Sequence, residues 1–353
     1  MLIEKKEDSQ REFKAPIPSI DWEITDFCNF KCEYCCQGQY NPKKIRHGHA
    51  DDATIGAVLK TIDSLPGIWQ VKLLGGEALI HPKFFDICGK LAESKHLIKI
   101  TTNFFAPRHM IERLVSVCGS KLVSMAISLH PSQVNIDDFI EKIIWFKSIK
   151  NPSTYLLVTC VVTKDNYQRL RKVKETFKEK GINFGYHALQ ENGKFAAYPE
   201  EIENEIKGDF LVHTEAIRGK SFFGTRCHSG QFFLVIKPNG DVFRCHDFQL
   251  GGYLGNIAKG TFRRFSEAMP CLSKKCLCTA MPARNLIRFN DRESPLNLGY
   301  LIYKTLMNDK EFSKKAFQKV ATISKSGLNA LIKRNNKSSN VSLILIQKNN
   351  KTS

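Results

Sequence analysis

Short apolar runs alternate with segments of helical periodicity over the first part of the chain, from about residue 19 to residue 190. The apolar runs are five to eight residues long, as buried strands are, and the segments between them place apolar residues three or four positions apart, as amphipathic helices do. The predicted strands are Asp21–Thr25, Gln70–Leu74, Ile98–Thr102, Val123–Ser128, Tyr155–Val162 and Asn183–His187. The predicted helices are Asp52–Ser64, Lys83–Ser94, Ala106–Cys118, Val134–Ile149 and Tyr167–Lys180.

This alternation predicts an α/β fold of parallel β/α units, arranged either as an open doubly wound sheet or as a barrel. In both arrangements, functional groups collect at the carboxyl ends of the strands. Polar or glycine residues stand at four predicted strand ends: a cysteine loop that starts at Cys28, the segment Gly75–Glu77, Asn103 and Ser128. We therefore expect the functional site at this edge of the sheet.

After residue 200 the pattern changes to that of a β-hairpin. Phe232–Arg244 consists of two apolar runs joined by a Pro-Asn-Gly-Asp turn. The cysteines around this hairpin are Cys227, Cys245, Cys271, Cys276 and Cys278. Because Cys227 and Cys245 bracket the hairpin, it brings both thiols to one end, which predicts a second cysteine cluster in a small second domain.

The predicted organisation has four parts. They are an N-terminal extension over residues 1–18, a core domain over 19–205, a cysteine-rich domain over 220–290 and a basic, partly disordered tail over 300–353. The tail carries eleven Lys or Arg residues against two acids between Leu301 and Ser353, which is half of the net charge of +18. Such a tail is usually a solvated extension, and it can also bind nucleic acid, an acidic partner or a membrane surface.

Composition narrows the class of protein further. The chain has 353 residues, of which 42% are hydrophobic, enough for a buried core. No stretch approaches eighteen consecutive apolar residues, so we expect no membrane span, and the charged N-terminus does not resemble a secretory signal. We therefore expect a cytoplasmic protein, in which twelve clustered cysteines indicate metal ligation under reducing conditions.

The cysteine loop carries the most specific chemistry. Cys28, Cys32 and Cys35 are separated by three and then two residues, directly after the first predicted strand. Three thiolates on one short loop can bind three irons of a cubane cluster and leave the fourth iron open to another ligand. A structural zinc site is the alternative, but it usually takes two separated ligand pairs, and no histidine is close in sequence.

This loop, with Tyr34 directly before the third cysteine, resembles the signature loop of the radical S-adenosylmethionine (radical SAM) enzymes. The resemblance covers roughly residues 19–200. It implies a partial (β/α)6 TIM-type barrel with a 4Fe-4S cluster on Cys28, Cys32 and Cys35, and S-adenosylmethionine on the open iron beside Tyr34.

Three strand ends strengthen the resemblance. Gly75, Gly76 and Glu77 are similar to the family motif that receives the methionine amino group of the cofactor. The resemblance implies that the Glu77 carboxylate accepts this amino group and that the two glycines allow close backbone approach. Asn103 resembles the end of the next strand, and Ser128 resembles a residue near the ribose and carboxylate of the cofactor.

Two positions depart from the family pattern. Ala78 replaces a common proline after the Gly-Gly-Glu motif, and Phe104 replaces a common glycine after the asparagine.

The later cysteines resemble the SPASM and twitch extensions of the same enzymes, which carry auxiliary iron–sulfur clusters. The similarity rests on Cys227, Gly240 and Cys245, separated by twelve and then four residues. A SPASM domain normally has seven cysteines and this chain offers five after residue 220, which favours a shortened, twitch-like domain with one auxiliary 4Fe-4S cluster. Which of Cys271, Cys276 and Cys278 complete its ligands is open.

The resemblance implies an oxidoreductase or maturase that reductively cleaves S-adenosylmethionine to a 5′-deoxyadenosyl radical, which takes a hydrogen atom from the substrate. The expected substrate is a peptide or a small sugar-type metabolite, and the expected electron donor is a reductase, flavodoxin or ferredoxin. An auxiliary cluster with four protein ligands then accepts an electron and makes net oxidation feasible. His130 and His187, at strand ends, are candidate proton donors or substrate contacts.

Two other functions remain open on the sequence. One is an RNA-modifying radical SAM enzyme that holds its substrate with the basic tail. The other is a non-catalytic module that uses zinc or iron–sulfur clusters for folding or sensing.

Overall fold

The computed structural model describes residues 18–35, 46–191, 194–208, 223–246, 252–271 and 286–292. Its helices are α1 (Asp52–Ser64), α2 (Phe84–Glu93), α3 (Arg108–Cys118), α4 (Ile136–Ile149), α5 (Tyr167–Glu179) and α6 (Glu200–Gly208), with short 3-10 turns at Ala78–Ile80 and Gly119–Lys121. The core strands are β1 (Ser19–Thr25), β2 (Gln70–Gly75), β3 (Leu97–Thr102), β4 (Leu122–Leu129), β5 (Tyr155–Val162) and β6 (Asn183–Ala188). The remaining strands are β7 (Gln190–Glu191), β8 (Lys194–Phe195), β9 (Thr225–Cys227), β10 (Phe233–Ile236), β11 (Asp241–Phe243), β12 (Tyr253–Asn256), β13 (Met269–Pro270) and β14 (Ile287–Arg292).

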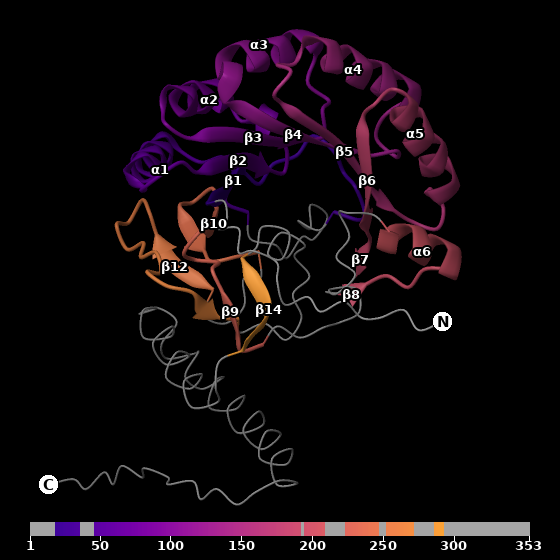
Figure 1. The fold of residues 1–353 in the computed structure, drawn as a ribbon. Helices are drawn as coiled ribbons and strands as arrows, with labels where there is room; N and C mark the ends of the chain where they lie inside the picture. Colours follow the sequence, from indigo (N-terminus) through magenta and orange to yellow (C-terminus); the bar gives the residue numbers. More distant parts are fainter. Residues whose placement is uncertain are drawn as a thin grey trace, which may run out of the picture.

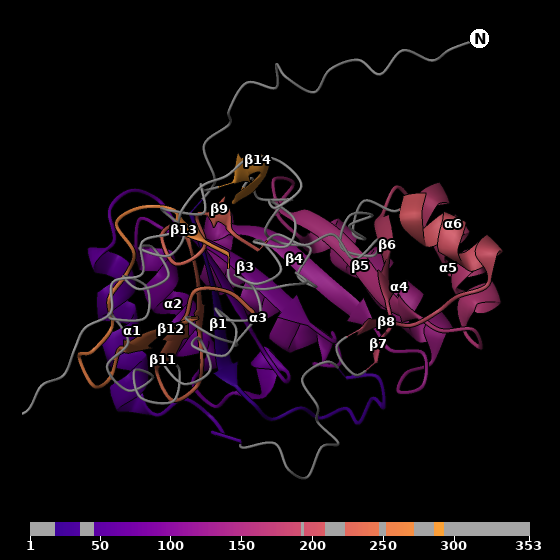
Figure 2. The same cartoon turned by 90° about the horizontal axis from the view of Figure 1, so that it is seen from below.

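The core strands form a parallel sheet in the order β1 to β6, and this confirms the partial (β/α)6 barrel. Helices α1 to α5 form an outer arc around the sheet (Figure 1). The two views agree in placing β12 at one end of this sheet and β6, with α5 and α6, at the other (Figures 1 and 2). The sheet therefore curves as an open barrel rather than lying flat between two helix layers.

Alternation along β1 shows why these strands fold as they do. Ile20, Trp22 and Ile24 are fully buried in the core that the outer helices share, whereas Asp21 and Glu23 point to the opposite, inner face. Burying one such large apolar side chain stabilises the fold by about 1.5–3 kcal/mol. The apolar half of the alternation thus fixes which face of the strand meets the helices.

The predicted hairpin extends the barrel sheet. β10 pairs in parallel with β1, with Phe233 opposite Ser19 and Ile236 opposite Trp22, and β11 and β12 follow as antiparallel strands. Gly240 takes a φ of 83° in the turn between β10 and β11, which favours glycine. Cys227 packs with Phe233, which pairs with Ser19 at the amino end of β1, whereas the cysteine loop follows the carboxyl end of β1.

The three-stranded sheet β13–β9–β14 is separate from the barrel sheet. Residues 1–17 of the predicted extension, the tail 300–353, and Cys276 and Cys278 lie outside the described residues, so the four-part division of the chain stays a prediction. Within the residues that the structure describes, no helix is long and apolar enough to cross a membrane.

Candidate functional site

The cysteine loop leaves the carboxyl end of β1, as predicted. Cys32 is buried, with 5% of its surface exposed, and Cys28 and Cys35 are half-buried. The amide of Phe30 donates to the Cys28 Sγ at 3.4 Å, and the amide of Cys35 donates to the Cys32 carbonyl at 3.1 Å. A tight turn with an N–H directed at a sulfur is thus already formed within the loop.

The three thiols lie close enough to influence one another. Burial raises the pKa of Cys28, and the negative charges of Glu77 and Cys35 raise it further. Burial, followed by the charges of Cys35 and Cys28, raises the pKa of Cys32 to about 11. Metal binding at this loop must therefore release protons from the thiols. In the described ranges, no three carboxylate, thiol or imidazole groups are arranged as ligands of one single metal ion.

Gly75 and Gly76 allow the end of β2 to pass against the start of the cysteine loop. A Cβ on Gly75 would lie 2.2 Å from the Thr25 carbonyl oxygen, and a Cβ on Gly76 would lie 2.0 Å from the Phe27 carbonyl oxygen. The Gly76 amide donates to Thr25 at 2.9 Å and the Glu77 amide donates to Phe27 at 2.8 Å. The close backbone approach predicted for the two glycines is therefore an approach of the β2 end to the backbone of Thr25 and Phe27.

The Glu77 carboxylate links the ends of β2 and β3. It is 3% exposed; Oε1 accepts from the Leu79 amide at 3.1 Å and from the Thr102 hydroxyl at 2.8 Å, and Oε2 accepts from the Asn103 amide at 2.7 Å. Burial raises the pKa of Glu77, and the hydrogen bonds from Asn103, Thr102 and Leu79 oppose this rise. Three of about four acceptor positions of the carboxylate are therefore used, which leaves one for another donor.

Asn103 reaches the cysteine loop itself. Its side-chain amide lies 2.9 Å from Asn29 Oδ1 and 3.9 Å from Cys28 Sγ, and its Oδ1 accepts from the Phe105 amide at 3.1 Å. The structure thus joins the ends of β1, β2 and β3 through Cys28, Glu77 and Asn103.

The turn after Asn103 is held in an unusual conformation. Phe104 has a φ of 60° and is the one non-glycine residue with positive φ in the described ranges, a conformation that glycine adopts without strain. Lys142 on α4 donates to the carbonyls of Phe104 at 2.8 Å and Ala106 at 2.5 Å, and its ammonium lies 4.9 Å from the centre of the Phe104 ring. Lys142, which sequence reasoning missed, therefore holds this turn beside the cysteine loop.

The two candidate histidines differ in position. His130 Nδ1 lies 3.2 Å from Cys32 Sγ and 3.2 Å from the Tyr34 hydroxyl, and burial lowers the pKa of His130 to about 4. His187 lies near the end of β6, in register with Val161. The structure brings His130 to the candidate cluster site.

Tyr34 lies in the cysteine loop, and Ser128 lies near the carboxyl end of β4. Burial, followed by the charge of Cys32, raises the pKa of Tyr34. Ser128 is half-buried at the carboxyl end of β4 and pairs in register with Thr159 of β5. Thr159 shares the inner face of the sheet with Ser128, and its place in a continuous apolar run hid it from sequence reasoning.

Charged pairs line the inner face near β1. Asp21 is fully buried; its Oδ2 lies 2.5 Å from the Lys72 ammonium and 2.8 Å from His246 Nε2. Glu23 is 2% exposed, and both its oxygens accept from Lys237, at 2.7 and 2.8 Å. The sequence-based predictions did not include these residues. The sequence does carry a signal for them, because parallel strands are usually apolar on both faces and β1 instead alternates two acids with apolar residues.

The later cysteines gather around a small apolar cluster. Cys227, with 3% of its surface exposed, packs with Phe233, and Cys245 and Cys271 lie against the same cluster. Cys227 Sγ lies 2.6 Å from the Ser229 hydroxyl. Three of the five predicted auxiliary cysteines thus belong to or contact one apolar cluster, and the other two lie outside the described residues.

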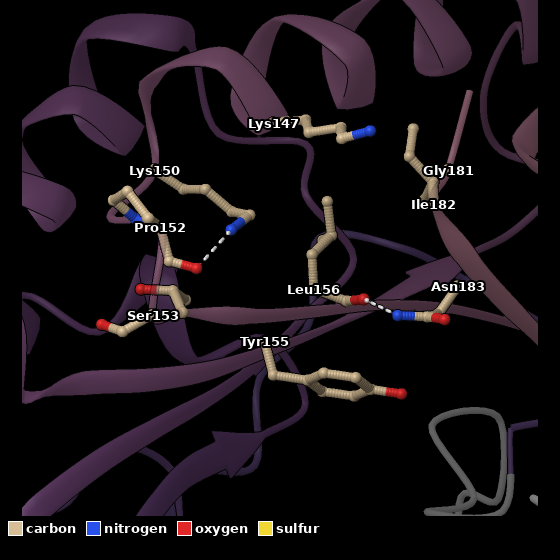
Figure 3. Close-up of a pocket in the computed structure, with 10 residues that line it drawn as sticks. Lys147, Lys150, Pro152, Ser153, Tyr155, Leu156, Gly181, Ile182 and Asn183 are labelled. Atoms are coloured by element: carbon tan, nitrogen blue, oxygen red, sulfur yellow. Dashed lines mark hydrogen bonds between the residues drawn. The ribbon is translucent and has the colours of Figure 1, made fainter.

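A cavity of about 300 Å³ lies at the opposite edge of the barrel, at the amino ends of β5 and β6 (Figure 3). Lys147 donates to the Lys180 carbonyl at 2.5 Å, and Lys150 donates to the Pro152 carbonyl at 3.5 Å. Both lysines therefore donate hydrogen bonds to backbone carbonyl groups near helix ends. The cavity is separate from the cysteine loop.

A protein-family model described as the Radical SAM superfamily matches residues 22–184. The tungsten-containing aldehyde ferredoxin oxidoreductase cofactor-modifying protein of Pyrococcus furiosus is 22% identical over 198 residues, which are 52% of this chain and 53% of that protein. The GTP 3′,8-cyclase of Haemophilus ducreyi is 27% identical over 126 residues, which are 35% of this chain and 37% of that protein. The chain thus spans about half, or less, of the length of these relatives.

Solved structures share the fold at low sequence identity. The structure of anSMEcpe with bound AdoMet matches with a TM-score of 0.51 and 16% identity, covering 69% of this chain and 76% of that chain. The structure of Streptococcus suis SuiB bound to S-adenosylmethionine matches with a TM-score of 0.50 and 17% identity, covering 69% of this chain and 64% of that chain.

Proposed function

Because residues 22–184 form a radical SAM domain, we propose that the protein is a radical SAM oxidoreductase or maturase whose cysteine loop holds a 4Fe-4S cluster and S-adenosylmethionine. When bound, the cluster and S-adenosylmethionine supply a 5′-deoxyadenosyl radical that takes a hydrogen atom from the substrate. The observation that carries the proposal is the junction of three strand ends around Cys28, made by Glu77 and Asn103. Both comparison structures above contain S-adenosylmethionine, which supports the assignment.

The residues of the loop fit a cluster of this kind. Cys28, Cys32 and Cys35 provide three thiolates, and a fourth cysteine is not needed where the cofactor completes the coordination. The Phe30 amide already points at the Cys28 sulfur, and N–H groups directed at ligand sulfurs are what such clusters require. The near-complete burial of Cys32 keeps water from that side of the loop.

The surrounding residues orient and bind the cofactor. The remaining acceptor position of Glu77 takes an amino group, and its three existing hydrogen bonds hold the carboxylate in place. Ser128 offers a hydroxyl at the end of β4, and Tyr34 offers an aromatic ring beside the loop. These residues bind and orient, while the cofactor carries the bond-breaking chemistry.

An auxiliary 4Fe-4S cluster on the later cysteines completes the proposal. Cys227, Cys245 and Cys271 lie around one apolar cluster, and Cys276 or Cys278 supplies the remaining ligand. Bound in such a twitch-like domain, the cluster would supply an acceptor for the electron that the substrate radical gives up, which would make net oxidation feasible. A peptide or a small sugar-type metabolite is the substrate, and the charged inner wall of the barrel suits a polar molecule.

A reducing compartment such as the cytoplasm suits this chemistry, because every described cysteine is a free thiol and the clusters need low-potential electrons. A reductase, flavodoxin or ferredoxin supplies these electrons.

Metal analysis tests both clusters. Anaerobically reconstituted wild-type protein should contain about eight irons, and a Cys28→Ala, Cys32→Ala, Cys35→Ala variant should contain about four. Electron paramagnetic resonance (EPR) spectra of the reduced wild type should change when S-adenosylmethionine is added, because the open iron gains ligands. Zinc in place of iron, or a spectrum that does not respond to S-adenosylmethionine, would refute the proposal.

RNA is a second candidate substrate, because the chain carries a net charge of +18 and half of it lies beyond Leu301. This alternative predicts salt-sensitive RNA binding that disappears on truncation after Ser294. Binding that survives the truncation would rule out a role for the tail.

A further inference from the structure

The imidazole of His130 contacts the cysteine loop at three residues. Its Nδ1 lies 3.2 Å from the Cys32 sulfur and 3.2 Å from the Tyr34 hydroxyl. Its ring stacks on Tyr34, with centres 6.0 Å apart and planes 9° apart, and meets the edge of Phe30 at 5.6 Å and 80°. Two aromatic rings of the loop therefore fix the orientation of the imidazole.

A second contact holds the same two segments together. The amide of Lys31 donates to Gln133 Oε1 at 3.3 Å. The segment from His130 to Gln133 therefore contacts the loop on both sides of Cys32, at Lys31 and at Tyr34. These residues are about a hundred positions apart in sequence, and the fold alone brings them together.

We propose that His130 is a positioning residue whose Nδ1–H donates a hydrogen bond to the Cys32 sulfur and thereby raises the reduction potential of the cluster held by the loop. The proposal rests on the function proposed above, in which Cys32 is a cluster ligand. A ligand thiolate only accepts hydrogen bonds, so the proton resides on Nδ1 and Nε2 is left as an acceptor.

The direction of the effect follows from charge. A reduced cluster places more negative charge on its sulfurs than an oxidised cluster, so a donor at Cys32 stabilises the reduced state more. His130 thus makes the cluster easier to reduce by the electron donor. Its Nδ1 lies within 3.2 Å of both the Cys32 sulfur and the Tyr34 hydroxyl, so this nitrogen faces the cysteine loop.

The test is an EPR-monitored redox titration of the reconstituted full-length protein. His130→Phe keeps a ring between Tyr34 and Phe30 but removes the N–H, and His130→Asn keeps a donor at the position of Nδ1. His109→Phe, at an exposed site on α3, is the matched control. We expect His130→Phe to lower the equilibrium constant for reduction about tenfold, which is ~59 mV for a one-electron couple, while His130→Asn and His109→Phe stay near wild type.

An unchanged potential in His130→Phe, or an equal fall in His130→Asn, would overturn the proposal. If His130→Phe binds no cluster, wild-type protein with ¹⁵N-labelled histidine answers the same question. Its reduced cluster should show a weak magnetic coupling to a ring nitrogen that is lost in His130→Asn, and absence of this coupling would overturn the proposal. Failure of the wild type to bind any cluster on the loop would instead refute the function on which the proposal rests.

Discussion

Glu77 Oε2 accepts a hydrogen bond of 2.7 Å from the backbone amide of Asn103, which joins the end of β2 to the end of β3. Both residues are buried, with 3% and 5% of their surfaces exposed. Because Asn103 also reaches the Cys28 sulfur, this bond connects the Gly-Gly-Glu motif to the cysteine loop through two residues. The motif therefore shapes the loop, and in the proposed function it also offers an acceptor to the cofactor.

Glu77→Gln should destabilise the protein by about 1–3 kcal/mol, because the new amide group faces the N–H of Asn103 or Leu79 and leaves a buried donor without an acceptor. Urea unfolding of the cluster-free protein measures this change. Glu175→Gln, at an exposed site on α5, is the control and should stay within about 0.5 kcal/mol of wild type. Equal stability of the two variants would contradict the role of the carboxylate.

Gly76→Ala should abolish cluster binding, since its Cβ would meet the Phe27 carbonyl oxygen at 2.0 Å and displace the start of the cysteine loop. Gly56→Ala is the matched control, because it lies in α1 with no atom within 4 Å of the added Cβ. The control should gain up to about 1 kcal/mol from helix propensity and bind iron normally. Iron counts of both proteins check this, and a Gly76→Ala variant with full iron would contradict it.

Lys142→Met should loosen the turn at Phe104, because three backbone carbonyls lose their ammonium donor and a φ of 60° is unfavourable for phenylalanine. We expect a loss of about 1–3 kcal/mol in the free energy of unfolding. Faster hydrogen exchange at Asn103 and Phe105 would show that the loss is local. Lys60→Met, exposed on α1, serves as the control, and equal exchange in the two variants would exclude the proposed contact.

Glu205 on α6 should contribute stability that depends on pH. Partial burial raises the pKa of Glu205, but hydrogen bonds from Tyr167 and Tyr186 and the charges of Lys174 and Arg171 outweigh this, so the pKa lies below its ordinary value. A carboxyl whose folded pKa is lowered stabilises the protein above its unfolded pKa and loses this contribution as the pH falls through the folded value.

The difference in unfolding free energy between wild type and Glu205→Gln should therefore be larger at pH 7 than at pH 3. Urea titrations at the two values measure it. A difference that is equal at both, or larger in acid, would show that the carboxylate is not held in its charged form.

The local pattern of apolar and polar residues was sufficient to predict the strands and helices of the barrel. The strand predicted at Tyr155–Val162 and the helix predicted at Asp52–Ser64 match the structure at both ends, because periodicity and caps such as Asp51 are local signals. The motif at Gly75–Glu77 was also readable, although its contacts with Thr25 and Phe27 depend on how two strand ends approach.

Contacts between distant segments could not be predicted. The pairing of β10 with β1 joins residues more than 200 positions apart. The periodicity of neither strand indicates which other strand it pairs with. The sequence named His130 as a candidate without indicating its contact with Cys32, and it gave no sign of Lys142. A histidine at a strand end or a lysine on a helix has many ordinary roles, and only the fold shows that each reaches the loop or the turn beside it.

The most direct test of the central claim is cleavage of S-adenosylmethionine by anaerobically reconstituted protein in the presence of dithionite. Wild type should form 5′-deoxyadenosine and methionine, and the Cys28→Ala, Cys32→Ala, Cys35→Ala variant should form neither. Absence of 5′-deoxyadenosine from wild-type protein that carries its iron, or equal formation by the triple variant, would contradict the assignment of this loop.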